Sequence, residues 1–98
     1  MSDVADLMQK RMALVEKLAA LNSKQLLNTQ ARSGAEVELL ACIEMIERNG
    51  ESEAMLFARA DLEARYKAAI AVCEDCEREL DELAEQLNAL DKEIAEAQ

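Results

Sequence analysis

The chain contains no histidine, no proline and no tryptophan, and it has only two glycines, one phenylalanine and one tyrosine. Without histidine, it cannot form a His-based nucleophilic triad or the Glu-x-x-His metal sites of ferritin-like bundles. Gly34 and Gly50 stand alone, so there is no glycine-rich loop to bind phosphate. We therefore expect no catalytic residue, metal, cofactor or small-molecule substrate, and thus no enzyme.

Cysteine is scarce, with Cys42, Cys73 and Cys76 as the three thiols. An odd number cannot pair completely within one chain. Cys73 and Cys76 have the spacing of a CxxC motif, which in other settings indicates zinc or redox chemistry. Zinc would lack ligands here, because only one further cysteine and no histidine are present. Packing in a helical core is the favoured interpretation, and a two-thiol metal or redox site is the alternative.

Basic residues and long apolar runs are also few. The chain has 11 Lys and Arg against 21 Asp and Glu, a net charge of −10, which disfavours nucleic acid and anionic membranes as partners. The longest apolar run, 68–73, is far shorter than the roughly 20 residues of a transmembrane helix. The N-terminus lacks the basic and apolar regions of a signal peptide. A cytoplasmic location is the resulting expectation.

Helix-forming residues with a regular spacing make up the rest of the chain. It is 51% hydrophobic but 2% aromatic, so Ala, Leu, Ile, Val and Met supply the apolar surface. In the second half, spacings of three and four alternate without a break, which keeps one apolar seam facing a partner helix in a coiled coil. The seam positions are Met55, Arg59, Leu62, Tyr66, Ala69, Cys73, Cys76, Leu80, Leu83, Leu87, Leu90, Ile94 and Ala97.

The strongest interruption of helical pattern lies at 49–52. Gly50 suits the left-handed residue that ends a helix, and Ser52 suits the N-cap of the next one. So short a connection makes two long helices antiparallel neighbours. We therefore predict an all-α helical hairpin, a single domain over 1–98 with arms at about 3–48 and 53–97.

The first arm continues the same heptad pattern. After folding at the turn, facing seam positions have numbers that add up to 101, as for Leu7 and Ile94. The seam of the first arm contains Val4, Leu7, Arg11, Leu14, Leu18, Leu21, Gln25, Asn28, Arg32, Ala35, Leu39, Cys42 and Ile46. The two arms therefore share one register.

Charged residues beside the seam support this register. Antiparallel pairing brings the g positions of the two heptad patterns opposite each other. The fully charged g pairs have opposite signs, namely Lys10 with Glu93, Lys24 with Glu79, and Glu38 with Arg65. One pair on the other flank, Glu36 with Glu63, has like charges and counts against it.

The middle of the first arm is its weakest part. Polar residues occupy the seam there, and Ser33 and Glu36 fit a capping box around Gly34, whose presence inside a helix costs roughly 1 kcal/mol. Two alternatives stay open. Either the helix continues with a kink or local defect near 28–34, which we favour, or it breaks into helices at about 3–31 and 34–48.

Apolar residues exceed what a two-helix seam can bury, and contiguous exposed apolar patches usually mark interaction surfaces. Two explanations remain. Dimerisation into a four-helix bundle would bury the excess symmetrically and is the favoured one, whereas docking of a different protein would use the adaptable methionines. The candidate partner or dimer surface consists of Met8, Met12, Val15, Leu26, Leu40, Ile43, Leu56 and Phe57.

The first arm has four further features in order: the amphipathic stretch 11–18, the sequence Lys24-Gln25-Leu26-Leu27, then Gly34, and the sequence Glu38-Leu39-Leu40. Together, over about residues 7–48, they resemble the small helical chaperones of flagellar and type III export systems. Members of that group carry a first helix ending in Gln-Leu-Leu, a Gly-centred interruption, and a short Leu-rich helix before a long one. The resemblance implies a cytoplasmic protein that masks an aggregation-prone helix of an export substrate, and it assigns no binding residue.

The sequence thus favours a non-enzymatic protein–protein interaction module, a small adaptor or chaperone-like coiled coil. The alternative is a structural or assembly subunit of a larger particle that uses the coiled coil as a spacer or oligomerisation element.

Overall fold

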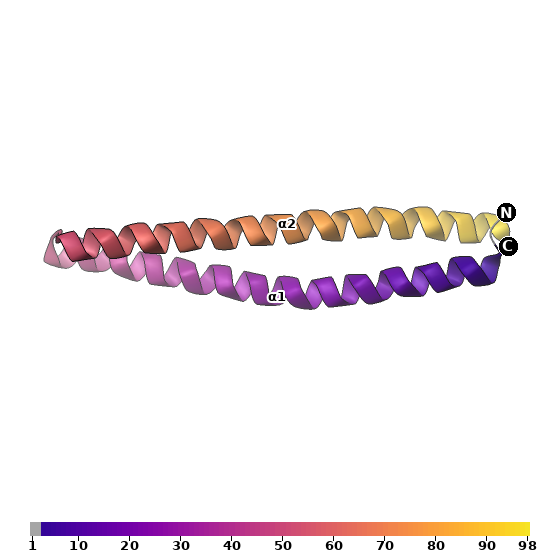
Figure 1. The fold of residues 1–98 in the computed structure, drawn as a ribbon, viewed down its shortest axis with the longest axis horizontal. Helices are drawn as coiled ribbons and strands as arrows, with labels where there is room; N and C mark the ends of the chain where they lie inside the picture. The colour runs from indigo at the N-terminus through magenta and orange to yellow at the C-terminus, as the bar shows by residue number, and fades with distance from the viewer. Residues whose placement is uncertain (1–2) are drawn as a thin grey trace. The chain divides into compact units, whose positions relative to one another are not determined.

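The computed structural model describes residues 3–98, in which two long helices are joined by a short turn (Figure 1). Helix α1 spans Val4–Asn49 and helix α2 spans Glu53–Ala97, and no strand occurs within residues 3–98. The chain is therefore the all-α antiparallel hairpin that the heptad pattern predicted. All four helix ends lie within one residue of the predicted ones.

The turn between the helices has the predicted chemistry at both of its ends. Gly50 has a φ of 84°, and its N–H donates to the carbonyl oxygen of Ile46 at 2.8 Å. This is the left-handed cap that satisfies one of the last carbonyls of a helix. The hydroxyl of Ser52 accepts a hydrogen bond from the N–H of Met55 at 3.1 Å, which makes Ser52 the N-cap of α2.

Helix α1 continues through 28–34, so the alternative of a break into two helices is wrong. The Gly-centred interruption that the resemblance implies is likewise not present. Gly34 is exposed, and a Cβ atom at this position would meet no other atom within 4 Å. The cost of roughly 1 kcal/mol for one glycine is smaller than the free energy gained by packing the half-buried seam residues on both sides of it, so packing overrides the local capping signal.

Residue contacts divide the chain into two compact units, each containing a segment of α1 and an antiparallel segment of α2. We name them the terminal unit, which comprises Met1–Gln25 and Cys76–Gln98, and the turn unit, which comprises Leu26–Asp75.

The core of the terminal unit lies on the predicted seam. Leu7, Leu90 and Ile94 form a buried cluster with Leu14 packed against it, and Leu7 is only 3% exposed. Cys76 is also buried, and its thiol donates to the carbonyl oxygen of Leu21 at 3.7 Å. Cross-helix contacts between these seam positions confirm the antiparallel register in this unit.

One seam position of the terminal unit is charged. Arg11 is half-buried and its Nε lies 2.7 Å from Oδ1 of Asp91, at the side of the seam. The aliphatic part of such a side chain can cover apolar surface while the guanidinium reaches solvent. Arginine is therefore tolerated at this position without a buried, unpaired charge.

The core of the turn unit contains Cys42, Ile46 and Cys73. The Cys42 thiol donates to the carbonyl oxygen of Met55 at 3.9 Å, which brings the two helices together close to the turn. Over both units, every predicted seam position from Val4 to Ile94 is buried or half-buried. Ala97 alone is exposed among them, because it is the last residue of α2.

Candidate interaction surfaces

No group of three or more His, Cys, Asp or Glu side chains within residues 3–98 is arranged to hold a metal ion. The thiols of Cys42, Cys73 and Cys76 are buried in the seam, as expected for core packing. The described helices also contain no stretch that is long and apolar enough to cross a membrane.

Large apolar side chains are more frequent on the surface of the described chain than in its core. Seven hydrophobic residues are buried, whereas eleven large hydrophobic residues are exposed. Seven of the eight predicted surface residues are among the exposed ones, and the eighth, Ile43, is half-buried. The predicted set did not include Leu27, Val37, Met45 and Val72, which are also exposed. All four lie off the seam, which is the signal that identifies them.

In the terminal unit, the exposed apolar residues form what we call the Met8 surface, consisting of Met8, Met12 and Val15. Their spacing of four and three residues places them on one side of α1. Met8 and Val15 directly follow seam residues, so this surface borders the seam on one flank. Met12 is the most exposed of the three, at 63%.

In the turn unit, four residues form what we call the Leu40 surface, consisting of Leu40, Ile43, Leu56 and Phe57. Ile43 and Leu56 directly follow Cys42 and Met55, whose contact across the seam is described above, so both border the same flank. Leu40 lies one turn from Ile43 on α1. Leu26, exposed at 62%, lies in the same unit but outside this surface.

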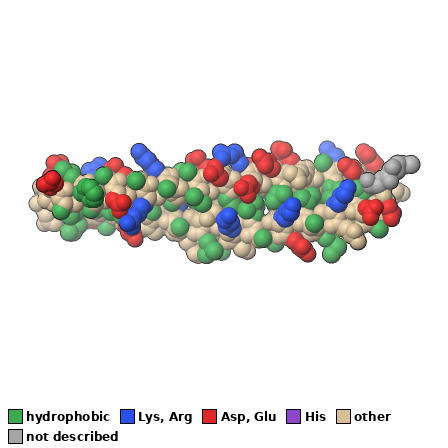
Figure 2. All heavy atoms as spheres, in the orientation of Figure 1, with side chains coloured by type: hydrophobic (Ala, Val, Ile, Leu, Met, Phe, Trp, Pro, Cys, Tyr) green, Lys and Arg blue, Asp and Glu red, His purple; other side chains and the backbone are tan. Residues whose placement is uncertain are grey.

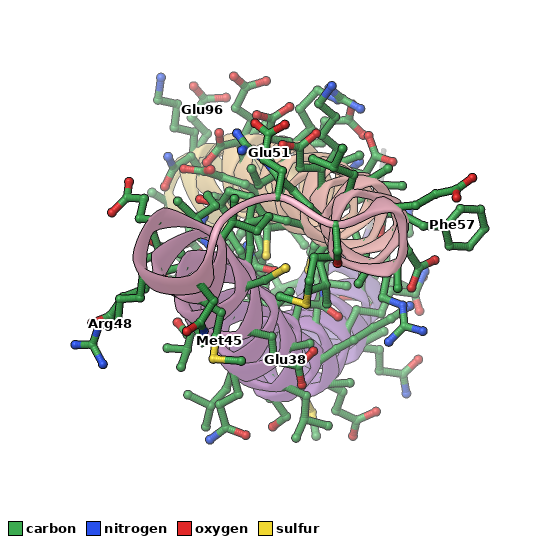
Figure 3. All side chains as sticks on the ribbon, turned by 90° about the vertical axis from the view of Figure 1, so that its left-hand side faces the viewer. Glu38, Met45, Arg48, Glu51, Phe57 and Glu96 are labelled. Carbon is green, nitrogen blue, oxygen red and sulfur yellow. The ribbon has the colours of Figure 1, made fainter. Side chains whose placement is uncertain are left out.

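Phe57 is the most exposed large hydrophobic side chain among the described residues, with 80% of its surface open to solvent. It projects away from both helices, and Met45 lies on a different side of the turn unit (Figure 3). Water contact with a complete phenyl ring is unfavourable, and aromatic rings are enriched at the centres of protein interfaces.

The turn unit, which contains the Leu40 surface, is strongly acidic. It has ten acidic and five basic residues in Leu26–Asp75. Three of its arginines make ion pairs within their own helices: Arg48 with Glu44 at 2.6 Å, Arg59 with Glu63 at 3.0 Å, and Arg65 with Asp61 at 3.0 Å. Within residues 3–98, none of these three arginines pairs with Glu36, Glu47 or Glu53. The surroundings of the Leu40 surface therefore favour a basic partner.

The opposite flank of the terminal unit carries a groove between α1 and α2. It consists of two adjoining hollows with volumes of about 410 and 440 Å³, and both are lined by Lys17 and Gln86. We call it the charged groove. Lys and Arg side chains stand at intervals among hydrophobic ones on the face seen in Figure 2. The remaining lining residues are Lys10, Ala13, Leu14, Ala20, Leu21, Lys24, Glu79, Glu82, Leu83, Ala89, Leu90 and Glu93.

The predicted charge pairs beside the seam are only partly realised. Lys10 and Glu93 line one hollow and Lys24 and Glu79 line the other, as the register predicts. Within residues 3–98, however, neither pair approaches to ion-pair distance, and Arg65 pairs with Asp61 and not with Glu38. Exposed ion pairs gain at most about 1 kcal/mol, so hydrated side chains and pairs within one helix compete with them successfully.

No known protein family, curated protein or solved structure matches this chain.

Proposed function

We propose that this chain is a non-enzymatic protein–protein interaction module, a small cytoplasmic adaptor or chaperone-like coiled coil. The observation that carries the proposal is that eleven large hydrophobic residues are exposed among the described residues, whereas seven hydrophobic residues, three of them cysteines, are buried. Removing apolar surface from water contributes roughly 25 cal/mol per Å² to association, so these side chains favour a bound state.

The Leu40 surface and its charges define the chemistry of the partner. An amphipathic helix that places apolar residues against Leu40, Leu56 and Phe57 would bring its polar edge close to Glu36, Glu47 and Glu53. Basic residues on that edge would gain from the acidic surroundings, while acidic ones would be repelled. The resemblance to export chaperones supports the same kind of ligand, an apolar helix that needs to be masked.

A structural or assembly subunit is the second candidate, because the two helices are unusually long. They contain 46 and 45 residues, and a globular helix averages about 11–12 residues. Such lengths suit a spacer or oligomerisation element. In that case the Met8 and Leu40 surfaces would be buried in a fixed homo-oligomer instead of remaining open for a ligand.

Binding of two synthetic amphipathic peptides tests the first candidate. One helix-forming peptide of Leu and Lys and a matched one of Leu and Glu would be titrated by fluorescence anisotropy. We expect the basic peptide to bind and the acidic one not to bind. Leu40→Glu should weaken binding at least tenfold, whereas Gln30→Glu, which adds the same charge at an exposed position of the same unit, should leave it unchanged.

Light-scattering chromatography over a wide concentration range separates the two candidates. A fixed assembly that binds neither peptide would support the structural subunit. Equal binding of both peptides, or equal effects of Leu40→Glu and Gln30→Glu, would contradict the assignment of the Leu40 surface as the partner site.

A further inference from the structure

We propose that the charged groove of the terminal unit binds a second copy of this chain, related to the first by a twofold axis that runs parallel to the helices. The charged groove lies on the flank opposite the Met8 surface, so its occupant is independent of the proposed partner protein.

The floor and edges of the groove suit packing against a second pair of helices. Leu14, Leu21, Leu83 and Leu90 line it with apolar side chains from both helices. The smallest lining residues are Ala13, Ala20 and Ala89, which allow a neighbouring helix to approach closely. The two hollows share Lys17 and Gln86, so together they offer a continuous track along the unit.

The two walls of the groove carry opposite charge. Lys10, Lys17 and Lys24 stand on α1 at intervals of seven residues, which is two helical turns. Glu79, Glu82 and Glu93 stand on α2. No ion pair joins the two walls within the described part of the chain, so both rows of charge remain available to a ligand.

An occupant of this groove must therefore present acidic groups to the α1 wall and basic groups to the α2 wall. A second copy does so by symmetry, because a twofold axis parallel to the helices places its α2 wall over this α1 wall and its α1 wall over this α2 wall. Heights along the axis are preserved by this operation. Lys10 then meets the second copy's Glu93 and Lys24 meets its Glu79, since these residues already lie at equal heights across the groove. The product is a four-helix bundle of antiparallel neighbours.

Two charge-reversed variants test this arrangement. The first carries Lys10→Glu, Lys17→Glu and Lys24→Glu, so both of its walls are acidic. The second carries Glu79→Lys, Glu82→Lys and Glu93→Lys, so both of its walls are basic. By sedimentation equilibrium, we expect the unaltered chain to be a dimer and each variant alone to associate at least tenfold more weakly. An equimolar mixture should restore the dimer, because acidic walls then face basic walls.

The matched control carries Glu77→Lys, Asp81→Lys and Glu85→Lys, three exposed residues of the same helix outside the groove. It has the same charge change as the second variant and should remain dimeric. Circular dichroism reports whether each variant stays helical. If a triple variant does not fold, the single changes Lys17→Glu and Glu82→Lys and their mixture replace it.

Several results would overturn the proposal. These are a monomeric unaltered chain, a mixture of variants that fails to associate, or a dimer that persists in both variants. A dimer that is lost with Leu40→Glu but kept in the two triple variants would place self-association on the Leu40 surface. Loss of peptide binding to the Leu40 surface with the dimer intact would refute only the proposed function.

Discussion

Replacing Gly34 by alanine should stabilise the chain, although this glycine belongs to the stretch that the sequence marked as weakest. It lies inside a continuous helix, it is exposed, and the added methyl group meets no other atom within 4 Å. Alanine is more favourable than glycine inside a helix by about 1 kcal/mol. With an unfolding entropy of about 2.1 cal/mol/K per residue, that gain corresponds to a rise in Tm of about 5 °C for a chain of this size.

The same substitution at Gly50 provides the matched control with the opposite sign. Gly50 has a φ of 84°, where an L-residue with a side chain costs roughly 1–2 kcal/mol, so Gly50→Ala should lower the Tm. Thermal unfolding followed by far-UV circular dichroism, at one protein concentration for all variants, measures both changes.

A Gly34→Ala variant with unchanged or reduced stability would contradict a continuous helix at residue 34. That outcome would show that residue 34 is not helical in solution and that the capping signal of Ser33 and Glu36 takes effect there. A stabilising Gly50→Ala would likewise contradict the left-handed cap at the end of α1.

Three further substitutions test the turn and the seam by chemical or thermal unfolding. Ser52→Ala removes the side-chain acceptor of the N-cap and should cost about 1 kcal/mol, and an unchanged stability would mean that the cap is not formed. Leu7→Ala should cost about 2–5 kcal/mol because Leu7 is 3% exposed, whereas Leu27→Ala, at a position 65% exposed, should cost far less. Leu83→Asp places a charge in the seam and should reduce helicity by destabilising the unit by several kcal/mol, while Ala84→Asp, at the exposed neighbouring position, should not. Equal effects of the last two would mean that the seam is misassigned.

The heptad pattern was sufficient to predict which residues face the opposite helix. Burying one apolar stripe is the main favourable term available to a two-helix chain, and a strict spacing of three and four permits only one such stripe. This explains why even Arg11, Asn28 and Arg32 are half-buried at their predicted positions. The excess of surface apolar residues followed from the same pattern, since a residue off the seam has no second helix within this chain to cover it.

The details of the charged residues could not be read from the pattern. Arg65 has two candidate acidic partners, Glu38 on the opposite helix and Asp61 one turn away on its own helix. Its ion pair forms with Asp61. Such choices depend on side-chain conformations whose free energies differ by less than about 1 kcal/mol. Spacing alone predicts which residues are neighbours, not which of two neighbours is bonded.

The two helices, the antiparallel turn and the seam between the helices follow from local and periodic features of the sequence. Gly50 and Ser52 act within one turn of their own helix ends, and the heptad repeats along the whole chain, so neither needs information from elsewhere. Three features became evident only in the folded chain: the continuation of α1 through Gly34, the set of hydrophobic side chains that remain exposed, and the lysine and glutamate walls that enclose the charged groove. These outcomes depend on the packing of residues far apart in the chain, where many small free energies compete.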